Sequence, residues 1–174
     1  MGNKKAFVKI ADTTVSSATS DVTLTGISST YEVFKVVILG STPSSDAQEF
    51  RFKFTVSGSA TSDSSYFAVA REILQNGIGS ITRSSETFFR WDILSGTSTQ
   101  EKMNGVIHIF NATNSDEYTY TTIENSFTNA IGITGSTAGG GVNKELRTVD
   151  GVNFSYASGN IASGRFILYG LRIT

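Results

Sequence analysis

The sequence has no cysteine, one proline, one histidine and one tryptophan among its 174 residues. Without cysteine the chain can form no disulfide, no thiolate metal site and no cysteine nucleophile, and this composition favours a protein made in a reducing cytoplasm. A single histidine cannot supply the ligands of an ordinary zinc site. We therefore expect no bound metal and no cofactor.

An excess of charge of one sign is also lacking. Lysine and arginine number 14 and aspartate and glutamate 15, which gives a formal net charge of -1. Proteins that bind nucleic acid by neutralising phosphates need a basic surplus, so nucleic acid is not an expected partner. No run of about 18 apolar residues is present, and no apolar signal stretch follows the basic start, so we expect neither a membrane span nor a secretory signal.

Small hydroxyl side chains and short alternating segments dominate the chain. The sequence has 24 serines, 22 threonines and 17 glycines. Phe50, Phe52 and Phe54 alternate with polar residues, as in a strand with one buried face. Such strands, separated by short polar turns, predict an all-β protein. We expect residues 1–174 to form a single antiparallel β-sandwich, jelly-roll-like, with nine or ten strands.

Several segments need a more specific interpretation. Residues 31–39 and 105–110 are apolar on both faces, which predicts strands placed centrally or against a second subunit. Residues 66–75 have the best helical composition, but a strand is favoured there too. Asn104-Gly105 has the composition of a tight turn. Residues 135–141 (GSTAGGG) are predicted to be an irregular, mobile loop.

No catalytic residue is expected, so the protein is predicted not to be an enzyme. His108 lies between Ile107 and Ile109 and is interpreted as a packed or interface residue, because no G-x-S-x-G nucleophile motif accompanies it. Acidic residues that could form a glycosidase pair have the neighbours typical of solvated charges on strand edges. They are Glu86, Asp92, Glu101, Asp116, Glu117 and Glu124. Asp116-Glu117 in a turn could hold calcium, but the spaced ligands of a specific calcium loop are missing.

Two groups of residues are candidates for contacts with a partner. Trp91 could stack on a sugar ring; the alternative is a half-buried tryptophan at the edge of the sandwich. Lys4, Lys5 and Lys9 give residues 1–10 the character of a basic N-terminal arm, either solvated or bound to an acidic partner.

Both ends of the chain carry strand-turn-strand motifs. The first set is Phe7-Val8-Lys9-Ile10, Thr13-Thr14-Val15-Ser16-Ser17, residues 22–28 (VTLTGIS) and Tyr31. The second set is Asp150-Gly151-Val152, residues 158–164 (SGNIASG) and residues 166–171 (FILYGL). Together these motifs resemble a family of small virion proteins and fibre-tip domains of tailed bacteriophages, especially marine and cyanobacterial ones.

The resemblance implies a β-sandwich or jelly roll that usually assembles as a trimer on the head surface or on tail appendages. It implies no active-site residues. The chain begins at Met1 and shows no coiled-coil or triple-helical shaft, which favours a trimeric capsid decoration or cement protein in the virion, bound to the major capsid protein or to other virion proteins. The alternative is a tail-fibre or receptor-binding protein that recognises a host surface glycan through Trp91.

Overall fold

The computed structural model describes residues 7–172, apart from the side chains of residues 92 and 93. These residues form thirteen strands and no helix, so no described helix is long and apolar enough to cross a membrane. The strands are β1 (Phe7–Val15), β2 (Asp21–Thr25), β3 (Val33–Pro43), β4 (Gln48–Val56), β5 (Ser59–Ala60), β6 (Tyr66–Leu74), β7 (Gly77–Glu86), β8 (Phe89–Ser95), β9 (Met103–Phe110), β10 (Thr119–Thr128), β11 (Thr134–Asn143), β12 (Gly151–Tyr156) and β13 (Ile161–Leu171).

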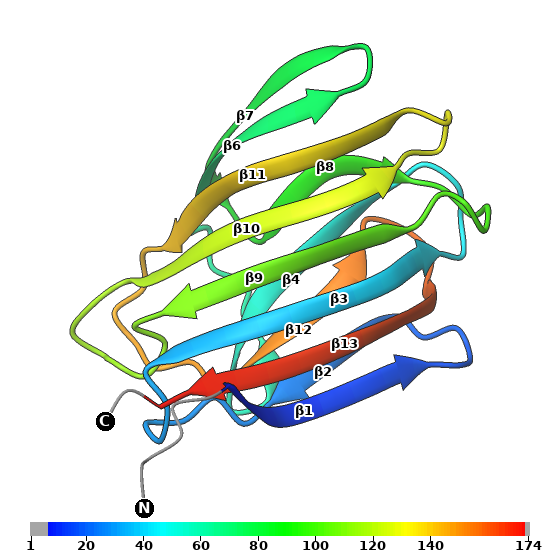
Figure 1. The fold of residues 1–174 in the computed structure, drawn as a ribbon. Coiled ribbons are helices and arrows are strands. Elements are labelled where there is room, and N and C mark those ends of the chain that lie inside the picture. The colour runs from blue at the N-terminus through cyan, green and yellow to red at the C-terminus, as the bar shows by residue number, and fades with distance from the viewer. Residues whose placement is uncertain (1–6, 173–174) are drawn as a thin grey trace, which may run out of the picture.

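The strands form two antiparallel sheets that pack face to face (Figure 1). The larger sheet has eight strands in the order β1-β13-β3-β9-β10-β11-β6-β7. The smaller sheet has the order β2-β12-β4-β5, with β8 also paired to β4. The predicted antiparallel β-sandwich is therefore confirmed, with more strands than the nine or ten expected.

Eight of the strands follow the nested pairing of a jelly roll. β1 pairs with β13, β2 with β12, β3 with β9, and β4 with β8. This is the pairing of one long hairpin folded over on itself, which places the four pairs alternately in two sheets. The β6–β7 and β10–β11 hairpins lie outside this set, and both extend the larger sheet beyond β9.

Aromatic side chains fill the space between the sheets. Phe50, Phe52 and Phe54 of β4 point inward and are at most 1% exposed, as their alternation predicts. The Phe50 ring centroid lies 5.4 Å from that of Trp91, and the Phe52 centroid lies 4.8 Å from that of Phe89. Burying one such side chain contributes about 1.5–3 kcal/mol, so this aromatic layer is a large part of the core's stability.

The two segments predicted to be apolar on both faces are neighbours in the middle of the larger sheet. They form β3 and β9, which pair with each other. Phe34, Val36 and Ile38 are fully buried, whereas Val33 and Val37 on the opposite face of β3 are only half-buried. The central position is confirmed, and the outer side of these strands remains partly open. Residues 66–75 are also confirmed as a strand, because they contain β6.

The prediction of a mobile loop at residues 135–141 is wrong. These residues belong to β11, which pairs along its whole length with β10 and with β6. A side chain on Gly141 would place its Cβ 2.5 Å from Cε1 of Phe89, and one on Gly139 would place it 2.3 Å from the Val69 carbonyl oxygen. Glycine is therefore required here by close approach of the sheets and strands, and not by chain flexibility.

The predicted turn at Asn104-Gly105 is wrong for a similar reason. Both residues lie within β9. A Cβ on Gly105 would come within 2.7 Å of Cη2 of Trp91, so this glycine makes room for the tryptophan ring. The glycine that suggested a turn is instead required in the strand, because there is no room for a side chain beside Trp91.

Replacing Gly141 by alanine tests this interpretation. We expect Gly141→Ala to lower the free energy of unfolding by about 1–3 kcal/mol, because the new methyl group overpacks the site between Phe89 and the Phe67 carbonyl. Gly77→Ala is the matched control, since a Cβ there meets nothing within 4 Å. Urea denaturation monitored by circular dichroism measures both; equal stability of the two variants would contradict the packing role of Gly141.

Candidate interaction surface

The outer face of the larger sheet carries a continuous line of apolar side chains, here called the apolar row. Its members are direct partners on seven consecutive strands, from the edge strand β1 to β6. They are Phe7, Leu171, Val33, Phe110, Tyr120, Val142 and Phe67. All seven are half-buried or exposed, so the row faces the surface of the molecule.

A second line of apolar residues lies on the same face, separated from the apolar row by a line that contains Lys35, His108 and Thr122. This line consists of direct partners on neighbouring strands: Ile167 of β13, Val37 of β3 and Val106 of β9. Val106 pairs with Glu124 of β10, which pairs in turn with Ala138 of β11. The corresponding face of the smaller sheet is polar. Its outward partners include Thr23, Asn153 and Lys53 in one line and Asp21, Ser155 and Arg51 in another. The outer face of the larger sheet is therefore richer in apolar side chains than that of the smaller sheet, although Lys35, His108, Thr122 and Glu124 lie among them.

A groove of about 730 Å³ lies on the apolar face over β10, β11, β6 and β7. Four members of the apolar row line it: Phe67, Phe110, Tyr120 and Val142. Gly140 forms part of the floor, where it offers no side chain. Lys144 also lines the groove, and its ammonium group lies 4.0 Å from the centroid of the Phe67 ring. This volume is in the range of small-ligand pockets, and the lining is predominantly apolar.

His108 also lies on this face, half-buried on β9. Its Nδ1 is 3.4 Å from the Thr122 hydroxyl. Burial, together with the nearby Lys35 ammonium group, lowers the pKa of His108 below its ordinary value, so the ring is neutral at pH 7. Among the described residues the ring makes no hydrogen bond to a carboxylate, unlike the histidine of a hydrolase triad. The interpretation as a packed strand residue agrees with this position.

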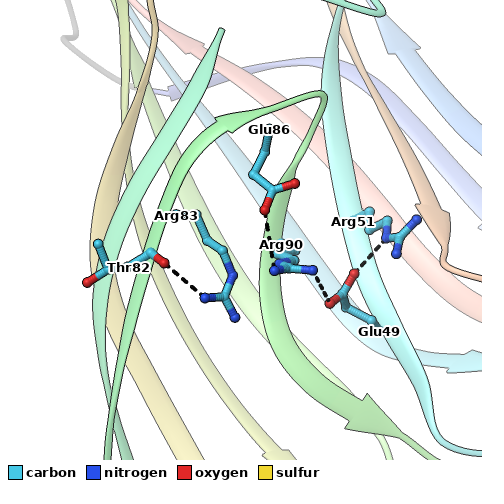
Figure 2. A network of polar contacts seen from close by, with 6 residues as sticks. All are labelled: Glu49, Arg51, Thr82, Arg83, Glu86 and Arg90. Carbon is cyan, nitrogen blue, oxygen red and sulfur yellow. Dashed lines mark hydrogen bonds and ion pairs between the residues drawn. The ribbon is translucent and has the colours of Figure 1, made fainter. Parts of the chain in front are cut away.

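Figure 2 shows that Glu86, the last residue of β7, belongs to a network of ion pairs with residues of β4 and β8. Nη2 of Arg90 lies 3.3 Å from Oε1 of Glu86, and Nη1 of Arg90 lies 3.2 Å from Oε2 of Glu49. Nε of Arg51 lies 2.6 Å from Oε1 of Glu49. The Arg51 guanidinium also lies 4.1 Å from the centroid of the Phe88 ring. These contacts link β8 to β4 on the outer face of the smaller sheet.

Two of the other candidate carboxylates accept hydrogen bonds from neighbouring groups. Glu101 accepts a hydrogen bond from the Ser98 amide, and Glu117 accepts one from the Asn111 side chain. The Asp116 amide donates to Asn114 Oδ1, as in the predicted turn. Glu124 lies on the apolar face of the larger sheet, and the side chain of Asp92 lies outside the described residues. Within the described part of the chain, no three histidine or acidic side chains form a cluster that could hold a metal ion.

The structure contradicts a glycan contact at Trp91. The side chain is 1% exposed and packs against Phe50 in the core. In β8, Phe89 and Trp91 both point between the sheets while Arg90 points outward, so the ring cannot meet a sugar in the folded protein. The alternative, a half-buried tryptophan at the sandwich edge, also underestimated its burial.

The structure contradicts the predicted N-terminal arm over residues 7–10. Lys4 and Lys5 lie outside the described residues, but residues 7–10 belong to the edge strand β1. The Lys9 ammonium group lies 2.9 Å from the carboxylate of Asp12, which also accepts two hydrogen bonds from Arg165, at 2.9 and 2.6 Å. Arg165 and then Lys9 hold the pKa of Asp12 well below its usual range. Lys9 therefore forms an ion pair with Asp12, a residue of the same strand, β1.

No family model matches the sequence, and no curated protein or solved structure gave a match. The functional proposal therefore rests on the outer face of the larger sheet. The sequence indicated part of it, because Val33 and Phe110 lie in the two segments that are apolar on both faces and could contact a second subunit. The other members of the apolar row were missed. The alternation around Tyr118 and Tyr120 was the available signal, but the row becomes visible only when the register aligns seven strands.

The burial of Trp91 has a direct spectroscopic consequence. We expect native protein to show blue-shifted tryptophan emission and weak quenching by acrylamide, because the one indole is enclosed by the aromatic layer. Unfolding in urea provides the control and should shift the emission to the red and restore quenching. Strong quenching of the native protein would show that the indole is accessible.

Proposed function

We propose that this protein is a structural component of a bacteriophage virion and forms a homotrimer that decorates the capsid. The observation that carries the proposal is the apolar row on the outer face of the larger sheet, which continues across seven strands. Exposed apolar surface of this extent typically marks a protein–protein interface. The strand-turn-strand motifs at both ends of the chain, which resemble small virion proteins, support the placement in a virion.

The size of this face fits a stable contact between subunits. Eight strands about 4.8 Å apart, each about 27 Å long, give a projected area on the order of 900 Å². A standard interface buries roughly 800 Å² on each partner. The face is therefore large enough for a contact between copies, while the polar face of the smaller sheet stays available for water or for the capsid.

Attachment to the capsid is the second part of the proposal. Lys4 and Lys5 carry the basic contact to an acidic capsid surface, since Lys9 is already paired with Asp12. Contacts between exposed charges are screened over about 8 Å at physiological ionic strength. The attachment therefore weakens as the salt concentration rises.

A tail-fibre or receptor-binding protein is the second candidate. The groove favours it, because Tyr120 is 47% exposed there and offers an aromatic face to a host surface glycan that Trp91 does not offer. Aromatic rings and nearby hydroxyl groups, such as those of Thr122 and Thr82, are suited to the apolar and polar sides of a sugar. The two candidates differ in where the protein sits in the virion.

The oligomeric state tests the role of the apolar face. We expect light scattering at micromolar concentration to give a mass about three times 18.6 kDa. Val37→Asp should dissociate the trimer, because it places a charge in the middle of the apolar face. Lys53→Asp, on the polar face of the smaller sheet, is the control and should leave the mass unchanged. A wild-type monomer would contradict the proposed trimer.

The copy number in the virion separates the two candidates. A decoration protein occupies many equivalent sites on the capsid, so we expect hundreds of copies, comparable to the major capsid protein. Tail fibres number in the tens or fewer. Quantitative gel densitometry of purified virions measures this ratio, and a count close to that of the tail fibres would move the protein from the head to the tail.

A further inference from the structure

The same sheet that carries the groove also carries two exposed isoleucines, here called the isoleucine knob. Ile73 of β6 and Ile78 of β7 are direct partners near the end of the β6–β7 hairpin. They are 60% and 73% exposed, among the most exposed large apolar side chains of the described residues. Covering these two side chains with another surface would remove their apolar area from water, which is favourable.

The knob cannot fill the groove of its own chain. Phe67, at the groove, and Ile73 lie on the same face of β6 and are six residues apart. At about 3.4 Å per residue this is a separation of roughly 20 Å along a rigid strand. Any contact between knob and groove must therefore join two molecules.

The lining of the groove suits an aliphatic occupant better than a sugar. Apolar side chains form most of its walls, namely those of Phe67, Phe110, Tyr120 and Val142. Thr82, Arg83, Ser84 and Lys144 supply the polar part of the lining, and the Thr122 hydroxyl lies 3.4 Å from Nδ1 of His108. A sugar carries a hydroxyl group on most of its carbons, and each one buried without a partner costs about 1–3 kcal/mol. An isoleucine side chain needs no such partner and gains from burial.

Both features belong to the additions to the jelly roll. The β6–β7 and β10–β11 hairpins build the floor and most of the walls of the groove, and β6–β7 also presents the knob. The nested pairing of the other eight strands does not require either hairpin. One chain thus presents an apolar projection and an apolar hollow in two different places.

We propose that the isoleucine knob of one copy inserts into the groove of a second copy, and that this contact joins the subunits of the trimer. The inference rests on the proposed self-assembly and names the surfaces that carry it. Repeated head to tail with a rotation of 120° between copies, this contact closes into a ring of three, whereas a reciprocal exchange about a two-fold axis would give a dimer. The members of the apolar row outside the groove, Phe7, Leu171 and Val33, then lie beside the contact.

A mixing experiment with two aspartate variants tests this contact. Ile78→Asp alters the knob and Tyr120→Asp alters the groove; both side chains are exposed, so each variant should fold with a melting temperature close to that of the wild type. We expect each variant alone to be monomeric at micromolar concentration by native mass spectrometry. A 1:1 mixture should form a heterodimer, because the intact knob of Tyr120→Asp fits the intact groove of Ile78→Asp. Thr23→Asp, on the polar face, is the control and should remain trimeric.

Each other result has a definite meaning. If both variants remain trimeric, the knob–groove contact is wrong while the proposed trimer stands. If both become monomers but the mixture does not associate, the knob contacts a surface other than the groove and the inference is overturned. If the wild type is a dimer whose variants behave as expected, the contact is supported and the trimer is wrong. A wild-type monomer overturns both.

Discussion

The structure depends on the close packing of aromatic rings against glycines across the two sheets. Trp91 occupies the space that Gly105 leaves free, and Phe89 occupies the space over Gly141. Because protein cores are packed as densely as crystals of small molecules, a single methyl group at either glycine must displace a ring or a backbone atom. This constraint explains why a glycine-rich segment forms a paired strand in the middle of the larger sheet.

The same constraint shapes the outer surface of that sheet. β11 has small residues on its outer side as well as on its inner side, and Gly140 leaves the floor of the groove without a side chain. The neighbouring strands carry Phe67, Tyr120 and Phe110, which rise on both sides of this floor. The small residues of β11 thus allow close packing in the core and also leave a hollow on the opposite face, between larger apolar side chains.

The distribution of polarity gives the sandwich two different sides. The smaller sheet presents charged and amide side chains, and the Glu49, Arg51, Arg90 and Glu86 network fixes its β8 edge. The larger sheet presents the apolar row, the groove and the knob. Titratable groups on the larger sheet make ordinary structural contacts, as His108 does with Thr122. The self-association that we propose would bury these apolar features and requires no ligand.

The fold class follows from the amino-acid sequence alone, because a period of two in apolar residues such as Phe50, Phe52 and Phe54 fixes strands with one buried face. For residues 31–39 and 105–110 the sequence left two positions open, central in the sandwich or against a second subunit, and the strand order shows that they are central. Alternation shows that two faces differ, but it does not show which strands are neighbours or which face of a mixed segment points inward. Only the tertiary structure decided that Trp91 is buried, that residues 135–141 form a strand, and that seven outward side chains align in one row. Each of these depends on the register between strands distant in sequence, which local composition does not encode.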